Sequence, residues 1–210
     1  MADFINTIDL LGDDVVVDSI IKRTITKFDD DKVISIGSCA FYKCLELTEV
    51  NCPNIGTIGA WSASVGADAF NGCTALKSVR LPSLGTISSA TTRIFSGCTS
   101  LEYVDLSSLM SVGSGTFYGC TSLKVIDLPK AKSMGGQTFG NCTALTAIIL
   151  RSETIATIVT TTFTGSSIES GSGYVYVPRA LVDGYKAATN WSVYASQIRA
   201  IEDYPEITGG

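Results

Sequence analysis

One pattern recurs along most of this chain and limits its fold more than any other feature of the sequence. Each copy starts at a phenylalanine, which the first five copies follow with a cysteine three residues later and a leucine six residues later. The copies start at Phe41, Phe70, Phe95, Phe117, Phe139 and Phe163, with steps of 29, 25, 22, 22 and 24 residues. A unit of about 22 residues cannot bury its apolar side alone, so stacked copies must share one core, as in a solenoid.

A short alternating segment follows the leucine in each copy and predicts a strand. Its first inward position is occupied by Val50, Val79, Val104, Ile126 and Ile148, and its second by Cys52, Leu81, Leu106, Leu128 and Leu150. Alternation with a period of two is typical of a strand, and the proline that follows in three copies ends it. The preceding Phe-x-x-Cys stretch is too short for a full helix and predicts one helical or 3₁₀ turn.

Five of the seven cysteines fall in a single column of the repeat: Cys44, Cys73, Cys98, Cys120 and Cys142. Cysteine behaves as a small buried hydrophobe, so this column predicts inert thiols in the core beside the phenylalanines. A disulfide is the alternative that the residues leave open, although an odd number of cysteines cannot all pair within one chain. No C-x-x-C pair and no histidine occur, so no metal site and no cofactor are expected.

The repeat unit, for example AFNGCTALKSVRLP at 69–82, resembles the BspA-type leucine-rich repeat of proteins similar to the Treponema pallidum leucine-rich repeat protein. The resemblance covers about residues 33–178, in five to six copies. It implies an α/β repeat solenoid, which is short, right-handed and built from parallel strands. It also implies a bacterial cell-surface or extracellular location, adhesion to proteins or cells, and no enzymatic activity in the repeats.

The N-terminal residues differ from the repeat and predict a cap. Residues 1–32 are expected to form a helix around 14–23 and a strand over 24–28. The acidic run at 29–31 predicts a solvated turn, with calcium binding as the alternative. Aspartates interrupt every apolar run near the N-terminus, which predicts no signal peptide, and no run is long enough to span a membrane.

Residues 179–210 are expected to form a helical C-terminal cap and tail. A last strand is predicted over 174–177, and Pro178 fits the start of a helix over 179–188. Asn190 is expected to cap a second helix over 191–198. Apolar residues at helical spacing in these segments would cover the last repeat.

The outward positions of the strands are the candidate site, because solenoids bind partners on such faces. One outward column contains Glu49, Ser78, Tyr103, Val125 and Ala147, and the next contains Asn51, Arg80, Asp105, Asp127 and Ile149. Asp105 and Asp127 would be neighbours that repel, so we expect Arg80 to be their partner cation. Arg80, Tyr103, Asp105 and Asp127 are therefore predicted to bind a partner, with a solvated polar ladder as the alternative.

An insertion at 59–67 adds one further candidate, Trp61. An indole in such a loop is either packed against the solenoid or exposed for a partner, and both readings stay open.

Composition narrows the function further. The chain has 15 basic and 20 acidic residues, a net charge of −5, and no histidine. The charge argues against a nucleic-acid partner, and the lack of histidine removes Ser-His-Asp and Cys-His catalysis. We therefore expect a non-catalytic module that binds a protein or a glycan in adhesion at a bacterial surface. The alternative is a structural component of a phage or prophage particle, or a cytoplasmic location, and the oligomeric state stays open.

Overall fold

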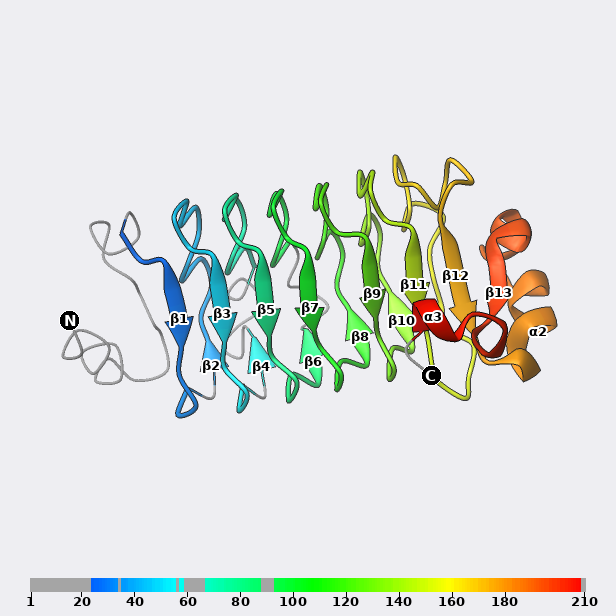
Figure 1. Ribbon diagram of the computed structural model, residues 1–210, viewed down its shortest axis with the longest axis horizontal. Helices are drawn as coiled ribbons and strands as arrows, with labels where there is room; N and C mark the ends of the chain where they lie inside the picture. Colours follow the sequence, from blue (N-terminus) through cyan, green and yellow to red (C-terminus); the bar gives the residue numbers. More distant parts are fainter. Residues whose placement is uncertain (1–23, 34, 56, 59–66, 88–92, 209–210) are drawn as a thin grey trace.

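The computed structural model describes residues 24–33, 35–55, 57–58, 67–87 and 93–208. Figure 1 shows an elongated coil whose strands lie side by side along the long axis. One side carries three- to four-residue strands in the orders β1-β3-β5-β7 and β9-β11-β12-β13, with β7 next to β9. These strands are β1 (Lys27–Asp29), β3 (Glu49–Asn51), β5 (Ser78–Arg80), β7 (Tyr103–Asp105), β9 (Val125–Asp127), β11 (Ala147–Ile149), β12 (Tyr174–Val177) and β13 (Ile198–Ala200).

A second side of the coil carries two-residue strands in the order β10-β8-β6-β4-β2. They are β2 (Ser35–Ile36), β4 (Thr57–Ile58), β6 (Thr86–Ile87), β8 (Ser111–Val112) and β10 (Ser133–Met134). All of these pairs are parallel and in register, as are those of the first side. The predicted parallel-strand solenoid is therefore confirmed.

The third side, which contains the Phe-x-x-Cys stretch, is a succession of turns rather than a helical turn. The amide of Cys44 donates to the Phe41 carbonyl at 3.0 Å, which closes one turn within the repeat. The amides of Phe41 and Lys43, however, donate to carbonyls of the next repeat, both at 2.8 Å. Because alternate amides bond between repeats, no run of i→i+3 bonds can build a helix here.

This turn also explains why four of the six repeats have a glycine at the same position. The second residue after the phenylalanine has a φ between 55° and 75°, at Lys43, Gly72, Gly97, Gly119, Asn141 and Gly165. Glycine adopts this left-handed conformation without the clash that a Cβ atom causes, and asparagine tolerates it better than most residues.

The six phenylalanines of the repeat form one continuous column in the core. All six side chains are fully buried, and successive ring centroids are 5.1 to 6.0 Å apart, with ring planes within 14° of parallel. Phe28 packs on Phe41 at one end of the column, and Trp191 and Tyr194 pack on Phe163 at the other. The column thus runs from the first described strand to the C-terminal cap.

The cysteine column lies beside the rings, and its thiols connect successive repeats. The Sγ atoms of Cys73, Cys98, Cys120 and Cys142 donate to the carbonyl of the phenylalanine that starts the preceding repeat, at 3.0 to 3.2 Å. Burial raises the pKa of Cys98 and of Cys142 to about 12. A thiol with such a pKa forms almost no thiolate at neutral pH, so these side chains are chemically inert there.

The C-terminal cap docks on the last repeat through two aromatic side chains. Tyr185 accepts a hydrogen bond from the Ala156 amide at 2.9 Å through its hydroxyl, and the Trp191 indole donates to the Ala156 carbonyl at 2.6 Å. The strand expected at 174–177 is present as β12. The elements around the docking residues are η2 (Arg179–Leu181), α2 (Val182–Ala187), η3 (Ser192–Gln197), η4 (Ile201–Asp203) and α3 (Pro205–Thr208).

Two expectations for this cap are wrong. Asn190 does not cap a helix, because it has a φ of 64° and its amide instead donates to the Ile158 carbonyl at 2.7 Å. The predicted second helix is the shorter 3₁₀ segment η3, which is kinked at Tyr194. It ends before Ile198 because that residue starts β13, where the chain gains ladder hydrogen bonds to β12.

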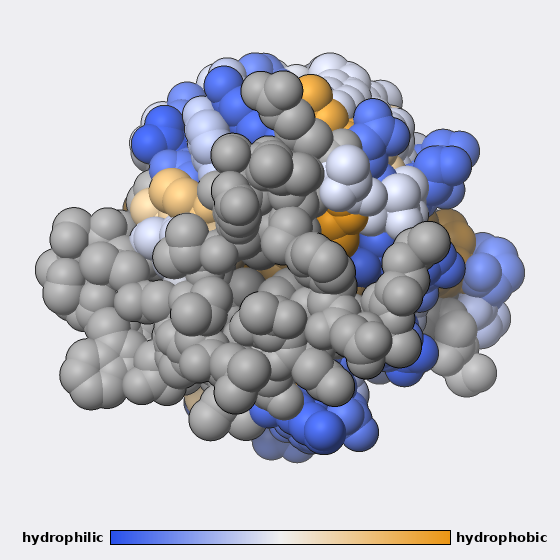
Figure 2. All heavy atoms as spheres, turned by 90° about the vertical axis from the view of Figure 1, so that its left-hand side faces the viewer, coloured by the Kyte–Doolittle hydropathy of each residue, from blue (hydrophilic) through white to orange (hydrophobic). Residues whose placement is uncertain are grey.

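At the other end, β1 starts three residues later than the strand expected at 24–28, and the helix expected around 14–23 lies outside the described residues. Within the acidic run, Asp29 ends β1, and Asp30 accepts a hydrogen bond from the Lys32 amide at 2.8 Å in the bend that follows. Asp29 accepts another from the Asn51 side chain at 2.8 Å. Figure 2 looks onto this end of the solenoid, where most visible described side chains are hydrophilic.

Candidate binding face

The strand face, defined here as the outward surface of β1, β3, β5, β7, β9, β11 and β12, contains four of the five predicted site residues: Arg80, Tyr103, Asp105 and Asp127. Tyr103 and Val125 lie at the same position of adjacent repeats, and 52% and 42% of their surfaces are exposed. The next residue of each strand, Val104 or Ile126, points inward and is buried in the core. The alternation of the strand therefore presents an aromatic and an aliphatic side chain to solvent on a rigid support.

An ion pair lies on the N-terminal side of this apolar pair. Arg80 is opposite Asp105 in the ladder between β5 and β7, and its Nε atom is 3.8 Å from Asp105 Oδ2. The arginine side chain is 55% exposed, so solvent screens the attraction strongly. The structure thus brings together three of the predicted residues, Arg80, Tyr103 and Asp105.

The expectation that Arg80 is the cationic partner of Asp127 as well as of Asp105 is wrong. Asp127 is paired with Arg151, whose Nε atom donates to Asp127 Oδ2 at 2.8 Å. The other carboxylate oxygen, Oδ1, is shielded from solvent and has no hydrogen-bond partner in the described part of the chain. Arg151 stands at the position where three of the other repeats have the proline that ends the strand, and this departure from the pattern was a signal for its role.

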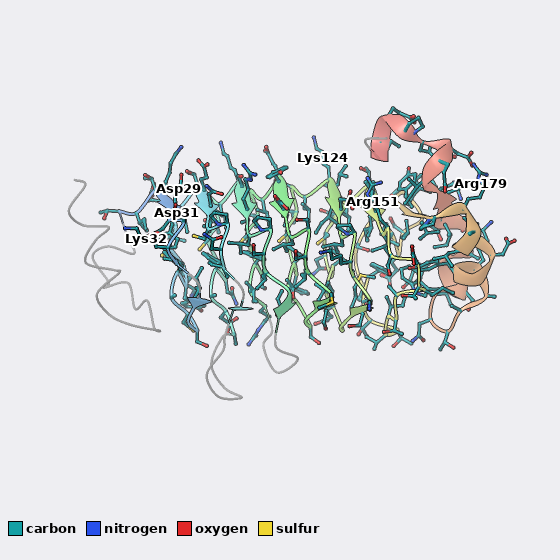
Figure 3. All side chains as sticks on the ribbon, turned by 90° about the horizontal axis from the view of Figure 1, so that it is seen from below. Asp29, Asp31, Lys32, Lys124, Arg151 and Arg179 are labelled. Carbon is teal, nitrogen blue, oxygen red and sulfur yellow. The ribbon has the colours of Figure 1, made fainter. Side chains whose placement is uncertain are left out.

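The C-terminal end of the strand face is covered by the chain itself. Ala147, Ile149 and Tyr176 point outward but are only 2 to 3% exposed, because Ile201 and Tyr204 pack on them. The rings of Tyr176 and Tyr204 have centroids 5.3 Å apart. Figures 1 and 3 show α3 lying over this part of the face.

This tail is held by polar contacts as well. Arg179 forms an ion pair with Asp203, and its backbone amide donates to the carboxylate of Glu202 at 3.1 and 3.2 Å. The guanidinium of Arg199 lies 4.6 Å from the centre of the Tyr174 ring. The open part of the strand face therefore ends at Val125, and the outward positions Ala147 and Ile149 are not available to a partner.

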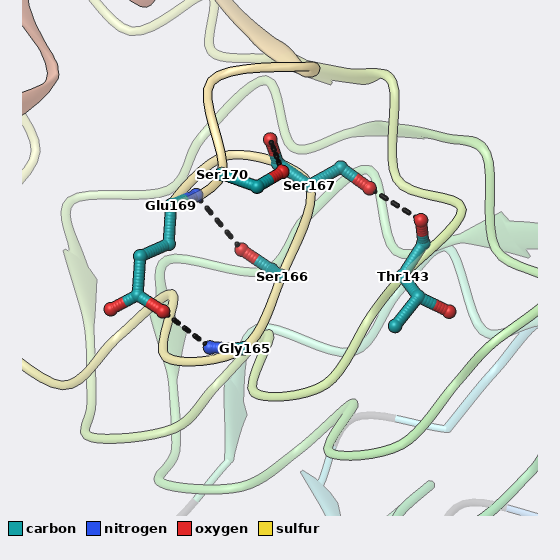
Figure 4. A pocket seen from close by; sticks show the side chains of 6 residues that line it. All are labelled: Thr143, Gly165, Ser166, Ser167, Glu169 and Ser170. Carbon is teal, nitrogen blue, oxygen red and sulfur yellow. Dashed lines mark hydrogen bonds between the residues drawn. The ribbon is translucent and has the colours of Figure 1, made fainter.

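The remaining predicted contact, Trp61, lies outside the described residues. The residues drawn in Figure 4 line a hollow of about 500 Å³ at the turns of the last repeat. Its side chains are used in local hydrogen bonds: Glu169 accepts from the Gly165 amide at 2.7 Å, and Ser167 donates to the Thr143 carbonyl at 2.6 Å. These bonds shape the turns, so we assign the hollow a structural role.

Within the described residues, no group of three or more cysteine, aspartate or glutamate side chains could hold a metal ion. None of the helices in that part of the chain is long and apolar enough to cross a membrane.

Parallel strands, a phenylalanine column and inward leucines at constant offsets define a leucine-rich repeat solenoid. The chain belongs to the BspA type leucine rich repeat family: residues 24–62 and 35–169 match this repeat region, in six copies. No curated protein sequence matches the chain.

Two solved structures of bacterial leucine-rich repeat proteins are similar to this chain. A leucine rich cell surface protein from Faecalibacterium prausnitzii is 19% identical, with a TM-score of 0.49, over 82% of this chain and 51% of that protein. A leucine-rich repeat protein from Eubacterium ventriosum is also 19% identical, with a TM-score of 0.50, over 69% of this chain and 44% of that protein. The chain thus spans about half the length of these proteins.

Proposed function

We propose that this chain is a non-catalytic module that binds a protein partner through the open part of the strand face, in adhesion or interaction at a bacterial surface. The observation that carries the proposal is the exposed pair Tyr103 and Val125, framed by two ion pairs. Tyrosine and arginine are common anchors of protein interfaces, and charged rims set orientation and specificity.

The rigid strands and core beneath this site favour binding. β7 is fixed by a ladder to β5 and β9 by a ladder to β11, and both strands lie on a buried core, so little conformational freedom remains to be lost when a partner docks. Reactive chemistry has no comparable basis, because the core thiols have raised pKa values and the sequence lacks histidine. Membership of a repeat family and likeness to a bacterial cell surface protein support the surface location.

The binding test uses the purified chain on an array of extracellular-matrix and cell-surface proteins. We compare the unaltered chain with Tyr103→Asp, and use Val193→Asp as the matched control, because Val193 is 75% exposed and lies in the C-terminal cap. Saturable binding that Tyr103→Asp weakens at least tenfold, or about 1.4 kcal/mol, is expected. Absence of saturable binding, or equal losses in both variants, would contradict the proposal.

The location is tested separately, with an antibody against the chain on washed native cells, cytosol, culture medium and induced phage particles. Signal on intact cells or in the medium is expected. Signal confined to phage particles or to cytosol would overturn the surface location and favour a structural role in a particle or an internal partner.

A further inference from the structure

A second hollow, of about 410 Å³, lies at the corner between the strand face and the second sheet, where the chain leaves β9 and β11. Three consecutive repeats line it, which contribute Met110, the segment around Pro129 and Lys130, and the segment 151–154. Its volume falls in the range of roughly 300–1,000 Å³ that is typical of small-molecule sites.

The hollow exists because one repeat is irregular. The repeat that starts at Phe139 has 24 residues, two more than the two before it. Part of the added length forms a protruding corner at 152–154, in which the hydroxyls of Ser152 and Thr154 are 3.2 Å apart and the Thr154 amide donates to Ser152. This corner forms one wall beside an otherwise regular stack.

The charge of the hollow also departs from the rest of the repeat. Lys130 and Lys132 are exposed lysines, and neither takes part in an ion pair within the described residues. In the three preceding repeats the position of Lys130 is uncharged, with Asn54, Ser83 and Ser108. Two unpaired cations therefore meet in one hollow of a chain whose net charge is −5.

We propose that this corner hollow binds an acidic glycan, with a carboxylate or sulfate group of one sugar between Lys130 and Lys132. The hydroxyls of Ser152 and Thr154 are placed to exchange hydrogen bonds with sugar hydroxyls, since they can both donate and accept. Met110, which is 44% exposed, and Pro129 supply an apolar surface for the C–H face of the ring. Glu153 is the one acidic side chain of the lining and sets a limit on affinity.

The test measures binding of defined oligosaccharides to the full chain by calorimetry at physiological salt. A hyaluronan octasaccharide carries carboxylates only and a heparin octasaccharide carries sulfates as well, whereas maltooctaose is neutral. The variant is Lys130→Ala with Lys132→Ala, and the matched control is Lys32→Ala with Lys186→Ala, two exposed lysines at opposite ends of the described chain. Glu153→Gln tests the sign of the electrostatic contribution.

We expect at least one acidic octasaccharide to bind saturably and maltooctaose not to bind. The hollow variant should weaken the affinity at least tenfold, the control less than twofold, and Glu153→Gln should strengthen it about two- to threefold. Binding to the carboxylate glycan alone or to both acidic glycans would identify the recognised group.

Three results would overturn the proposal: no saturable binding of either acidic glycan, equal losses in the hollow and control variants, or equal affinity for a single-stranded oligonucleotide of the same charge. The glycan-binding proposal does not depend on the protein-binding proposal, since Tyr103 does not line the hollow and Tyr103→Asp leaves the lining unchanged. Loss of glycan binding and loss of protein binding are therefore separable by variant.

Discussion

Truncation of one ring in the phenylalanine column should destabilise the whole solenoid. Phe117 is fully buried and stacked between Phe95 at 5.6 Å and Phe139 at 5.5 Å. Phe117→Ala removes its buried ring and leaves a cavity in a column that cannot collapse without moving both neighbouring repeats. Large-to-small changes of this kind cost about 3–5 kcal/mol. For a chain of this length that corresponds to a fall in Tm of about 6–20 °C.

The measurement is urea unfolding followed by circular dichroism. The matched control is Tyr103→Ala, which removes an aromatic side chain that is 52% exposed, and it should change the stability by less than about 0.5 kcal/mol. Equal m-values for the variants would show that the same amount of surface is exposed on unfolding. A loss below about 1 kcal/mol for Phe117→Ala, or a loss no larger than that of the control, would refute the stacked column as the main source of stability.

Four further outcomes follow from other contacts. Cys39 is exposed and should be the first thiol that a reagent labels, which mass spectrometry can measure. Stability should fall between pH 9 and 12, because the unfolded chain ionises Cys98 before the folded chain does, and urea unfolding at pH 8 and pH 10.5 measures this fall. Arg151→Ala should cost roughly 0.5–1 kcal/mol after solvent screening and Arg80→Ala less, with the difference shrinking in 1 M salt. Tyr204→Ala should uncover the apolar end of the strand face and increase binding of a hydrophobic dye, while circular dichroism stays unchanged.

The columns of the repeat could be predicted from the sequence because each copy meets the same surroundings. A phenylalanine or an inward leucine has an identical neighbour one repeat away, so its environment follows from periodicity alone. The outward register of Arg80 opposite Asp105 follows for the same reason.

Features that depend on contacts outside the repeat could not be predicted in this way. The partner of Asp127 is Arg151, which replaces a proline after the next strand. Only the path of the chain at that corner brings Arg151 Nε to 2.8 Å from Asp127 Oδ2. The burial of Ala147 and Ile149 depends on the tail turning back over β11 and β12, which no local pattern of residues 201–208 indicates. Asparagine is a good helix N-cap residue, but the side chain of Asn190 instead bonds the carbonyl of Ile158, which lies 32 residues earlier in the sequence.

A regular solenoid offers a partner a repetitive polar surface, so recognition requires positions at which the repeat is broken. Three such breaks lie close together along the stack. The exposed Tyr103 and Val125 interrupt the polar outward column, Arg151 replaces a proline, and the corner at 152–154 lengthens its repeat. The tail closes the face immediately beyond, over Ala147. Because the core columns are constant through this region, these three departures from the repeat alter the exposed surface and leave the core packing unchanged. The surface of β7, β9 and β11 with the corner below it is therefore where a partner would find features that the other described repeats do not offer.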